Sequence, residues 1–397
     1  MISIVIPTMW YFQPFVRYLN DLVNCNVIND ITIIDNRSEH RPDDPVFTNN
    51  KIKIIDPGTN IGVNPAWNLG VNNALMDKVV IINDDMIVDL KLFNRLHQFD
   101  APFGFVGLTI GETQFGQDPL VDGSIDIKRF DQFTSGHGSL LGMGTCFMVC
   151  KSYWTNIPSS LIYYCGDDWV VNTNVFLGRD NYTVSNCLFF TPGHTTCGNV
   201  LGDMDIATQT LEIEEYTDNF NTFMARKTLY DEYTVAAANI NSDIYVHLPR
   251  INDLLKDCVT AIEMGVRDGQ SSRAFLINDH LKLRSYDLYL DPHVEFLFGI
   301  ARTTGMDCQY VMANTLEIEI NEIDLLFIDT DHTYIQLSQE LKLHGNKAKK
   351  YLVFHDTVTY SKELLPAIFE FMADNPYWKI KQQYSDCNGL TILERTL

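Results

Sequence analysis

VVIINDDMIVD, at residues 79–89, joins a run of four apolar residues directly to Asn83, Asp84 and Asp85. An apolar run of this length that stops at polar residues is typical of a strand buried inside a sheet. A strand that ends on adjacent carboxylates places negative charge at the rim of the core. Three interpretations of this acidic end remain open: a solvated turn, a metal site, or one half of a catalytic pair.

The residues around this stretch alternate between strand and helix patterns. Apolar strands separated by short helices predict a parallel sheet that is covered on both faces. The predicted strands are residues 2–8, 30–36, 51–57 and 79–84, and the predicted helices are residues 14–24 and 64–76. Residues 101–200 are richer in Gly, Thr, Asn and aromatic side chains, and we expect them to complete the same domain with short strands and a helix.

A second α/β region follows a polar helical stretch at residues 211–240, which makes the best connector in the chain. Its predicted strands are residues 258–265, 285–291, 324–329 and 350–356. We therefore predict an α/β fold with two Rossmann-like domains in series and mainly parallel sheets. The predicted boundaries are 1–212 for the first domain, 213–242 for the connector and 243–397 for the second domain.

The composition is that of an acidic globular protein. The chain has 397 residues, of which 46% are hydrophobic, and its formal net charge is −22. That charge argues against nucleic-acid binding, which needs basic patches, and no apolar run approaches the roughly 18 residues of a membrane span. The cysteines form no C-x-x-C pair, and the N-terminal run lacks the basic start of a signal peptide. We therefore expect a cytoplasmic protein with reduced thiols, which could form a homo-oligomer.

Polar residues of the first domain gather where the predicted strands end. Thr8 and Asp35 follow the first two strands, and Asp84 follows the fourth. In open parallel sheets, ligands bind beyond these carboxyl ends. A diphosphate leaving group needs a divalent cation, and hard cations prefer carboxylate oxygens. The acidic pair at residues 43–44, in RPDDP, has the sequence of an exposed turn, so it is the buried strand before Asp84 that favours a ligand site there.

Residues 1–200 resemble family-2-like inverting glycosyltransferases with the GT-A fold. The matching segments, in order, are SIVIPT, ITIIDNRS, NIGVNPAWNLGV, IINDDMIVD, GMGTCFMVCKSYW, YYCGDDW and TPGHTTCGN. The resemblance implies that a nucleotide-sugar donor binds in the first domain. Its base and ribose would contact Pro7, Thr8 and Asp35, and Gly62 and Asn68 would flank its sugar.

The same resemblance assigns a divalent cation, Mn²⁺ or Mg²⁺, to the end of the fourth strand. Asp85 would bind the cation and Asp84 would support it, although Asn83 stands where a strict Asp-x-Asp motif has its first carboxylate. His194, in PGHTTCG, matches a late histidine that often completes the metal shell. A lone histidine is equally a common structural residue.

An inverting transfer also needs a general base within reach of the acceptor hydroxyl. CGDDW matches the acidic pair before an aromatic residue in the family, so Asp168 is the first choice for the base and Asp167 the second. The alternative is a turn held by hydrogen bonds of the aspartate side chains.

The second domain has a glycine-rich turn and two acidic strand ends. AIEMGVRDGQSS, at residues 261–272, has the pattern of a strand, a turn and a helix start, and Gly265 and Gly269 let the backbone approach a ligand closely. The dinucleotide fingerprint G-x-G-x-x-G is absent, which disfavours NAD. Two predicted buried strands, in LLFIDTDHTY and YLVFHDT, end in Asp and His residues that can bind a hard cation.

Residues 245–397 resemble class I S-adenosylmethionine-dependent methyltransferases, in particular small-molecule and sugar O-methyltransferases with ExGxxxGxS, FIDxDHxY and HDT motifs. By this resemblance, Glu263, Gly265 and Gly269 would contact the cofactor. Asp287 or Asp291 would reach its ribose hydroxyls.

Metal-dependent relatives of this class hold Mg²⁺ on carboxylates after the fourth and fifth strands. Asp329 and Asp356 match those places, with His355 as a third candidate ligand, and Thr357 stands where some relatives have Asn or Asp. His332 is then the best candidate for the general base.

We therefore expect a bifunctional enzyme. The first domain would transfer a sugar to a glycan or other acceptor, and the second would methylate a sugar hydroxyl. In an alternative hypothesis, one domain has lost catalysis and serves as a glycan- or nucleotide-binding module, which Asn83 motivates. A nucleotide-binding dehydrogenase is disfavoured by the missing fingerprint.

Overall fold

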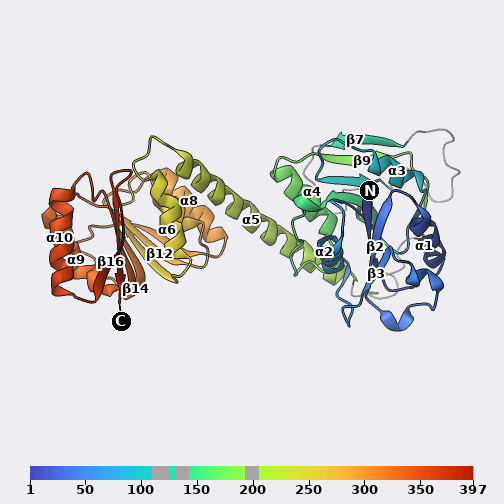
Figure 1. The fold of residues 1–397 in the computed structure, drawn as a ribbon, viewed down its shortest axis with the longest axis horizontal. Helices are drawn as coiled ribbons and strands as arrows, with labels where there is room; N and C mark the ends of the chain where they lie inside the picture. Colours follow the sequence, from blue (N-terminus) through green and yellow to red (C-terminus); the bar gives the residue numbers. More distant parts are fainter. Residues whose placement is uncertain (110–124, 131–142, 193–204, 397) are drawn as a thin grey trace. The chain divides into compact units, whose positions relative to one another are not determined.

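The computed structural model describes residues 1–109, 125–130, 143–192 and 205–396. The chain divides into two compact units, Met1–Phe220 and Asn221–Leu397, and each is built on a large sheet flanked by helices (Figure 1). Within the described residues, no helix is long and apolar enough to cross a membrane.

Among its described residues, unit 1 has an eight-stranded sheet. The strands are β1 (Ile2–Thr8), β2 (Ile28–Asp35), β3 (Ile52–Ile55), β4 (Lys78–Ile82), β6 (Phe105–Leu108), β7 (Asp126–Phe130), β8 (Cys146–Cys150) and β9 (Asn181–Ser185). Their order is β3-β2-β1-β4-β8-β6-β9-β7, and a small second sheet pairs β5 (Ile87–Val88) with β10 (Phe189–Phe190). β1 to β4 are parallel, and their order reverses between β1 and β4, which is the switch point of a doubly wound sheet. β8 is antiparallel to its neighbours β4 and β6, so the sheet is mixed.

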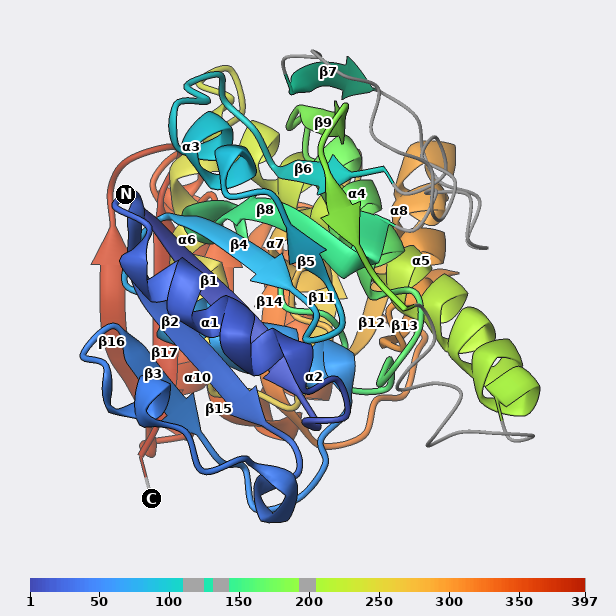
Figure 2. The same ribbon diagram turned by 90° about the vertical axis from the view of Figure 1, so that its right-hand side faces the viewer.

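Helices cover both faces of this sheet. One face carries α1 (Pro14–Asn24) and α3 (Lys91–His97), and the other carries α2 (Val63–Asn73) and α4 (Gly166–Phe176) (Figures 1 and 2). Successive residues of β1 point to opposite faces, so Ile4 and Ile6 join the core under α1. Val5 faces α2, where a Cβ at Gly70 would lie 2.1 Å from the Val5 side chain.

The structure confirms the predicted elements of the first domain. The strand predicted at residues 2–8 is β1, and the helix predicted at residues 14–24 is α1. β4 ends at Ile82, so Asp84 and Asp85 lie in the loop that follows the strand.

Within residues 221–396, unit 2 has a seven-stranded sheet. The strands are β11 (Thr260–Met264), β12 (Lys282–Asp287), β13 (Asp307–Met312), β14 (Ile323–Ile328), β15 (Ala348–His355), β16 (Trp378–Tyr384) and β17 (Leu390–Arg395). Their order is β13-β12-β11-β14-β15-β17-β16. The first five are parallel, with the switch point between β11 and β14, and β17 runs antiparallel to β15 and β16.

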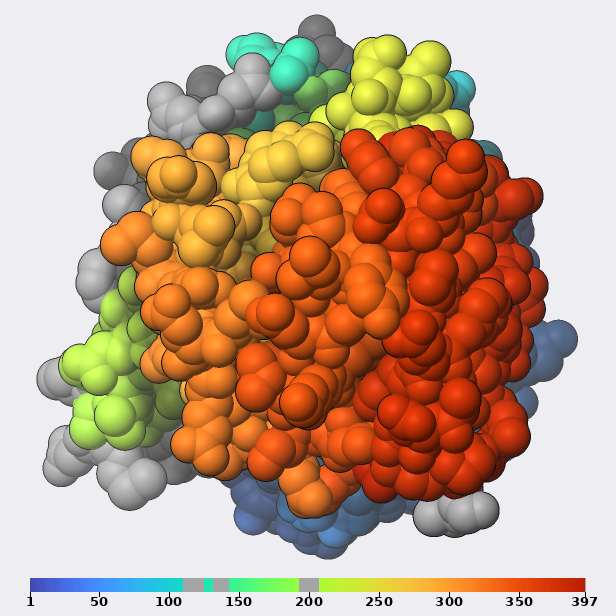
Figure 3. Space-filling view, turned by 90° about the vertical axis from the view of Figure 1, so that its left-hand side faces the viewer, coloured from blue at the N-terminus to red at the C-terminus, as the bar shows by residue number. Residues whose placement is uncertain are grey.

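The second sheet is also covered on both faces. One face carries α6 (Leu248–Leu255), α7 (Ser272–Leu276) and α8 (Pro292–Thr303), and the other carries α9 (Tyr334–His344) and α10 (Ser361–Asp374). Figure 3 shows the face on which α9 and α10 lie. Successive residues of β14 pack into hydrophobic cores on opposite faces of the sheet. Phe327 packs on the face that carries α8, and Leu326 packs on the face that carries α9.

The predicted helical connector is part of one long helix, α5 (Asp205–Ala238). It begins before the predicted stretch at 211–240, and the division between the units falls inside it, at Phe220 and Asn221.

Candidate active site

The carboxyl ends of the parallel strands in unit 2 form one edge of the sheet beside its switch point. Gly265 follows β11, Asp329 follows β14, and Asp287 is the last residue of β12. Asp356 follows β15. Because these strands are neighbours, residues far apart in the sequence come together at this edge.

Asp329, His355 and Asp356 form a cluster in which three ligand atoms lie within 4.8 Å of one another. His355 Nδ1 is 3.3 Å from Asp329 Oδ2 and 3.5 Å from Asp356 Oδ2. His355 and Asp356 are buried, and Asp356 Oδ1 has no hydrogen-bond partner among the described residues. Two carboxylates and an imidazole at this spacing fit a divalent cation such as Mg²⁺ or Mn²⁺.

Backbone carbonyls fix the orientation of His355. Its Nε2 donates to the carbonyl oxygens of Asp243 (3.1 Å) and Cys387 (3.3 Å). A carbonyl oxygen only accepts, so Nε2 carries a proton and Nδ1 is the atom that faces the carboxylates. Metal-binding histidines usually have their second nitrogen held in this way.

His332 lies beside the cluster and is half-buried. Its Nε2 is 2.8 Å from Asp356 Oδ2 and 3.2 Å from Asp329 Oδ1. The imidazole stacks on the ring of Tyr360, with the centroids 4.5 Å apart. The structure thus brings the predicted base to the predicted metal ligands.

The carboxylates and histidines shift each other's pKa values. Hydrogen bonds with Asp329 and Asp356 raise the pKa of His332 to about 9. Burial opposes a charge on His355, but the same carboxylates outweigh it and raise its pKa to about 10. Burial also opposes ionisation of Asp356, yet the two histidines hold its pKa well below the usual range. At neutral pH the protons on the histidines balance the carboxylates, and a bound cation would replace that charge.

The turn after β11 passes very close to the end of β14. Gly265 has a φ of 87°, and a Cβ there would lie 2.0 Å from the carbonyl oxygen of Asp329. Gly269 has a φ of 72°, and its Cβ would lie 2.6 Å from the side chain of Val294. Both positions therefore favour glycine, as the turn requires.

Glu263, predicted to contact the cofactor, is fully buried. Its carboxylate accepts hydrogen bonds from the hydroxyls of Ser271 (2.6 Å), Ser272 (2.8 Å) and Ser285 (2.6 Å). Burial raises its pKa to about 7, against the effect of these hydroxyls. Glu263 therefore fastens the helix start and β12 to β11, and any influence on a ligand would act through the turn that it holds.

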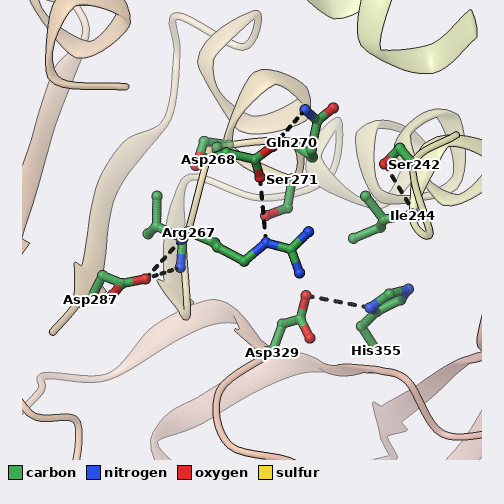
Figure 4. Close-up of polar contacts among 12 residues, drawn as sticks. Ser242, Ile244, Arg267, Asp268, Gln270, Ser271, Asp287, Asp329 and His355 are labelled. Carbon is green, nitrogen blue, oxygen red and sulfur yellow. Dashed lines mark hydrogen bonds and ion pairs between the residues drawn. The ribbon is translucent and has the colours of Figure 1, made fainter. Parts of the chain in front are cut away.

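Asp287 and Asp291, the two candidates for ribose binding, have different positions. Asp287 Oδ2 accepts from the backbone N–H of Val266 (2.7 Å) and of Arg267 (2.8 Å), which joins β12 to the turn (Figure 4). Asp291 is the N-cap of α8 and accepts the N–H groups of its first turn. The structure thus places Asp287 beside the glycine-rich turn and gives Asp291 a capping role.

Arg267 is a site residue that the sequence prediction missed. Figure 4 shows its side chain extending across the site, with Asp268 and Ser271 on one side and Asp329 and His355 on the other. The available signal was a cationic residue inside the stretch between Gly265 and Gly269.

In unit 1, Thr8 and Asp84 meet beside the switch point between β1 and β4. Thr8 Oγ1 donates to Asp84 Oδ2 at 2.5 Å, and the backbone N–H of Met9 donates to the same oxygen at 3.2 Å. Asp84 is buried, and burial raises its pKa to about 6. Pro7 precedes Thr8 in β1, and Asp85 follows Asp84 in a half-buried position.

Asp35, at the end of β2, is buried within the fold of unit 1. Its Oδ1 accepts from Trp10 Nε1 at 2.8 Å, and its Oδ2 lies 3.4 Å from the guanidinium of Arg41. These contacts hold the segment after β1 against the end of β2.

Gly62 and Asn68 bring α2 close to the segment before α4. Gly62 has a φ of 85°, and a Cβ there would lie 2.8 Å from the carbonyl oxygen of Ile162. The Asn68 side chain donates to the carbonyl oxygen of Ile157 (2.8 Å) and accepts from its N–H (2.9 Å). The amide of Asn68 is therefore used within the fold.

The acidic pair Asp167 and Asp168 lies in the first turn of α4. Burial and the neighbouring Asp168 raise the pKa of Asp167 to about 6, and Asp168 is itself buried. In the part of the chain that the structure describes, the unit 2 cluster is the one group of three metal-ligand side chains, so Asp85 joins no such group. His194, the other ligand predicted for unit 1, lies outside the described residues.

Comparisons with known proteins give little at the level of sequence. No family profile matches the chain, and no curated protein matches it.

Solved structures of methyltransferases match part of the chain at low identity and low TM-score. An S-adenosylhomocysteine-bound methyltransferase of Podospora anserina, PaMTH1, is 12% identical with a TM-score of 0.33, over 46% of this chain and 97% of that one. A 1,6-didemethyltoxoflavin-N1-methyltransferase of Burkholderia thailandensis is 9% identical with a TM-score of 0.31, over 43% of this chain and 87% of that one. An O-methyltransferase family protein of Burkholderia thailandensis is 13% identical with a TM-score of 0.30, over 38% and 56%. Similarity at this level does not identify an activity.

Proposed function

We propose that unit 2 is an S-adenosylmethionine-dependent O-methyltransferase that uses a divalent cation and acts on a sugar hydroxyl. The observation that carries the proposal is the cluster of Asp329, His355 and Asp356 at the switch point of a doubly wound sheet. Next to it lies the glycine turn after β11, whose backbone packs closely against Asp329 at Gly265.

In this proposal, Asp329, Asp356 and His355 hold the cation, which when bound orients and acidifies the acceptor hydroxyl. His332 would be the base for that hydroxyl, since its Nε2 lies 2.8 and 3.2 Å from the two carboxylates that would hold the cation. Its pKa of about 9 is caused by those carboxylates, so neutralising them with a cation lowers it toward the range of a general base. Asp287 serves the ribose, and Gly265 and Gly269 shape the turn along the rest of the cofactor.

For unit 1 we propose inverting sugar transfer from a nucleotide-sugar donor to a glycan or other acceptor. The supporting observation is that Thr8 and the buried Asp84 meet at the switch point of its own sheet, with Asp85 next in the chain. Asp85 would bind Mn²⁺ or Mg²⁺, and Asp168 or Asp167 would be the base.

Ligand binding to the full chain tests both proposals. We expect S-adenosylhomocysteine to raise the melting temperature of unit 2, with a further rise on adding Mn²⁺, and UDP or GDP with Mn²⁺ to stabilise unit 1. Differential scanning calorimetry separates the two effects if the units melt separately. Stabilisation by NAD and not by S-adenosylhomocysteine would reject the methyltransferase proposal.

A further inference from the structure

The turn after β11 has a backbone conformation that is costly for its side chain. Arg267 has a φ of 53°, in the left-handed region where glycine is favoured. A residue with a Cβ is less stable there than in the right-handed region. Strain of this kind is typical of positions at which a side chain has a function.

Hydrogen bonds hold the backbone of the turn in place, whereas the side chain of Arg267 is exposed. The N–H groups of Val266 and Arg267 both donate to Asp287 Oδ2. The Arg267 side chain is 78% exposed, and its Nε lies 3.7 Å from Asp268 Oδ1, a loose and exposed ion pair. Its guanidinium extends over the strand ends toward Asp329 (Figure 4).

Several other groups of this turn that could bind an anion donate to atoms of the fold. The N–H of Gly265 donates to Tyr286 (2.9 Å), and that of Gly269 donates to Val266 (2.8 Å). The hydroxyls of Ser271 and Ser272 donate to Glu263. These donors are therefore used within the fold, whereas the guanidinium of Arg267 is exposed.

We infer that Arg267 binds the α-carboxylate of the cofactor's amino-acid end; the inference rests on the proposed methyltransferase function. Beside this turn the cofactor would meet the acidic strand ends at Asp287, Asp329 and Asp356, the last two of which are proposed to hold the cation. The carboxylate of the cofactor needs a cationic partner among these acids, and a guanidinium matches a carboxylate with two parallel hydrogen bonds. Arg267 is thereby a cofactor-binding residue.

The experiment measures the binding of two ligands to the wild type and to a variant by isothermal titration calorimetry on the full chain. The ligands are S-adenosylhomocysteine and its decarboxylated analogue, S-adenosyl-3-thiopropylamine, and the variant is Arg267→Met, which keeps the length and apolar stem. We expect Arg267→Met to weaken S-adenosylhomocysteine about 10-fold or more and to leave the analogue as tight as, or tighter than, in the wild type. Arg267→Lys should restore part of the loss. Arg302→Met, which removes an exposed arginine of α8 paired with Glu295, is the control and should change neither affinity.

The outcomes separate the inference from the proposed function. If the wild type binds S-adenosylhomocysteine and Arg267→Met weakens both ligands equally or neither, the carboxylate assignment is overturned while the methyltransferase proposal stands. If the wild type binds neither ligand, both are overturned. Binding of the analogue by Arg267→Met shows that the variant is folded.

Discussion

Two glycines of unit 2, Gly265 and Gly305, have nearly the same φ but differ in the space available for an added methyl group. Gly265 and Gly305 have φ values of 87° and 85°. A Cβ at Gly265 would lie 2.0 Å from the carbonyl oxygen of Asp329, whereas a Cβ at Gly305 would have no neighbour within 4 Å. Alanine substitutions at these two glycines therefore separate the free-energy cost of a positive φ from the cost of a steric clash.

We predict that Gly305→Ala destabilises unit 2 by about 1 kcal/mol, because it has only the left-handed backbone to adopt. Gly265→Ala should cost about 1–3 kcal/mol more, because β11 or β14 must shift, and it should also weaken S-adenosylhomocysteine. Calorimetry and ligand titration of the two variants provide the measurement. Equal effects of the two substitutions would show that the close approach at Gly265 is unimportant.

We predict that Asp84 makes the stability of unit 1 depend on pH. Burial raises its pKa to about 6, so between about pH 4 and pH 6 the folded unit binds more protons than the unfolded chain. Stability therefore falls as the pH rises through this window, by about 2–3 kcal/mol in total. Asp84→Asn should remove this part of the pH dependence, as followed by denaturation in EDTA at pH 4, 5, 6 and 7. Asp43→Asn, at an exposed aspartate of the same unit, is the control; identical pH profiles for Asp84→Asn and the wild type would contradict the assignment.

The residues of the candidate site differ in how well the sequence predicts them. Asp329 and Asp356 could be predicted, because an apolar strand that stops at an acid is a local pattern. The buried state of Glu263 could not, since it depends on Ser285, which comes from the neighbouring strand. Arg267 was missed because its strained φ is a property of the folded turn.

At the scale of elements, the turn between β16 and β17 orients His355, a candidate metal ligand that lies on another strand. Cys387, Asn388 and Gly389 all have positive φ, at 42°, 63° and 93°. The Cys387 carbonyl accepts from His355 Nε2, and the Asn388 carbonyl accepts from the N–H of Val358 at 2.8 Å. The backbone of the turn thus holds the chain on both sides of Asp356.

We predict that Gly389→Ala weakens Mn²⁺ binding about 10-fold, because its Cβ would lie 2.6 Å from the N of Val358 and would displace the turn. The measurement is a Mn²⁺ titration followed by electron paramagnetic resonance. Gly305→Ala has a similar φ without the collision and should bind Mn²⁺ as the wild type does. An unchanged affinity in Gly389→Ala would mean that His355 does not need the turn.

The elements themselves were largely predictable, and their arrangement was not. β1 and α1 have the predicted bounds because their apolar patterns are strong and local. β12 begins at Lys282 and ends at Asp287, earlier than predicted, because the apolar residues 288–290 are exposed instead of continuing the strand. The strand order and the antiparallel β8 depend on pairing between distant segments, which no local pattern records.

At the scale of the whole molecule, the two units use the same construction. Unit 1 contains the strand order β3-β2-β1-β4, and unit 2 contains the corresponding order β13-β12-β11-β14. In each unit the order reverses before the last of these four strands, and an acidic residue follows that strand. That acid is Asp84 after β4 and Asp329 after β14. In the functions proposed above, this repeated construction would provide one site in each unit.

If the two sites are separate, a substitution in one site should leave the activity of the other unchanged. We predict that Asp356→Ala lowers methyl transfer at least about 100-fold, because a metal ligand is lost, and changes sugar transfer less than about two-fold. Asp85→Ala should do the reverse, and the double variant should lack both activities. Both transfers are measured on the full chain by mass spectrometry of the products from a panel of nucleotide sugars and acceptors. Asp331→Ala and Asp43→Ala, at exposed aspartates, are the controls, and a parallel loss of both activities in either single variant would show that the two units work as one site.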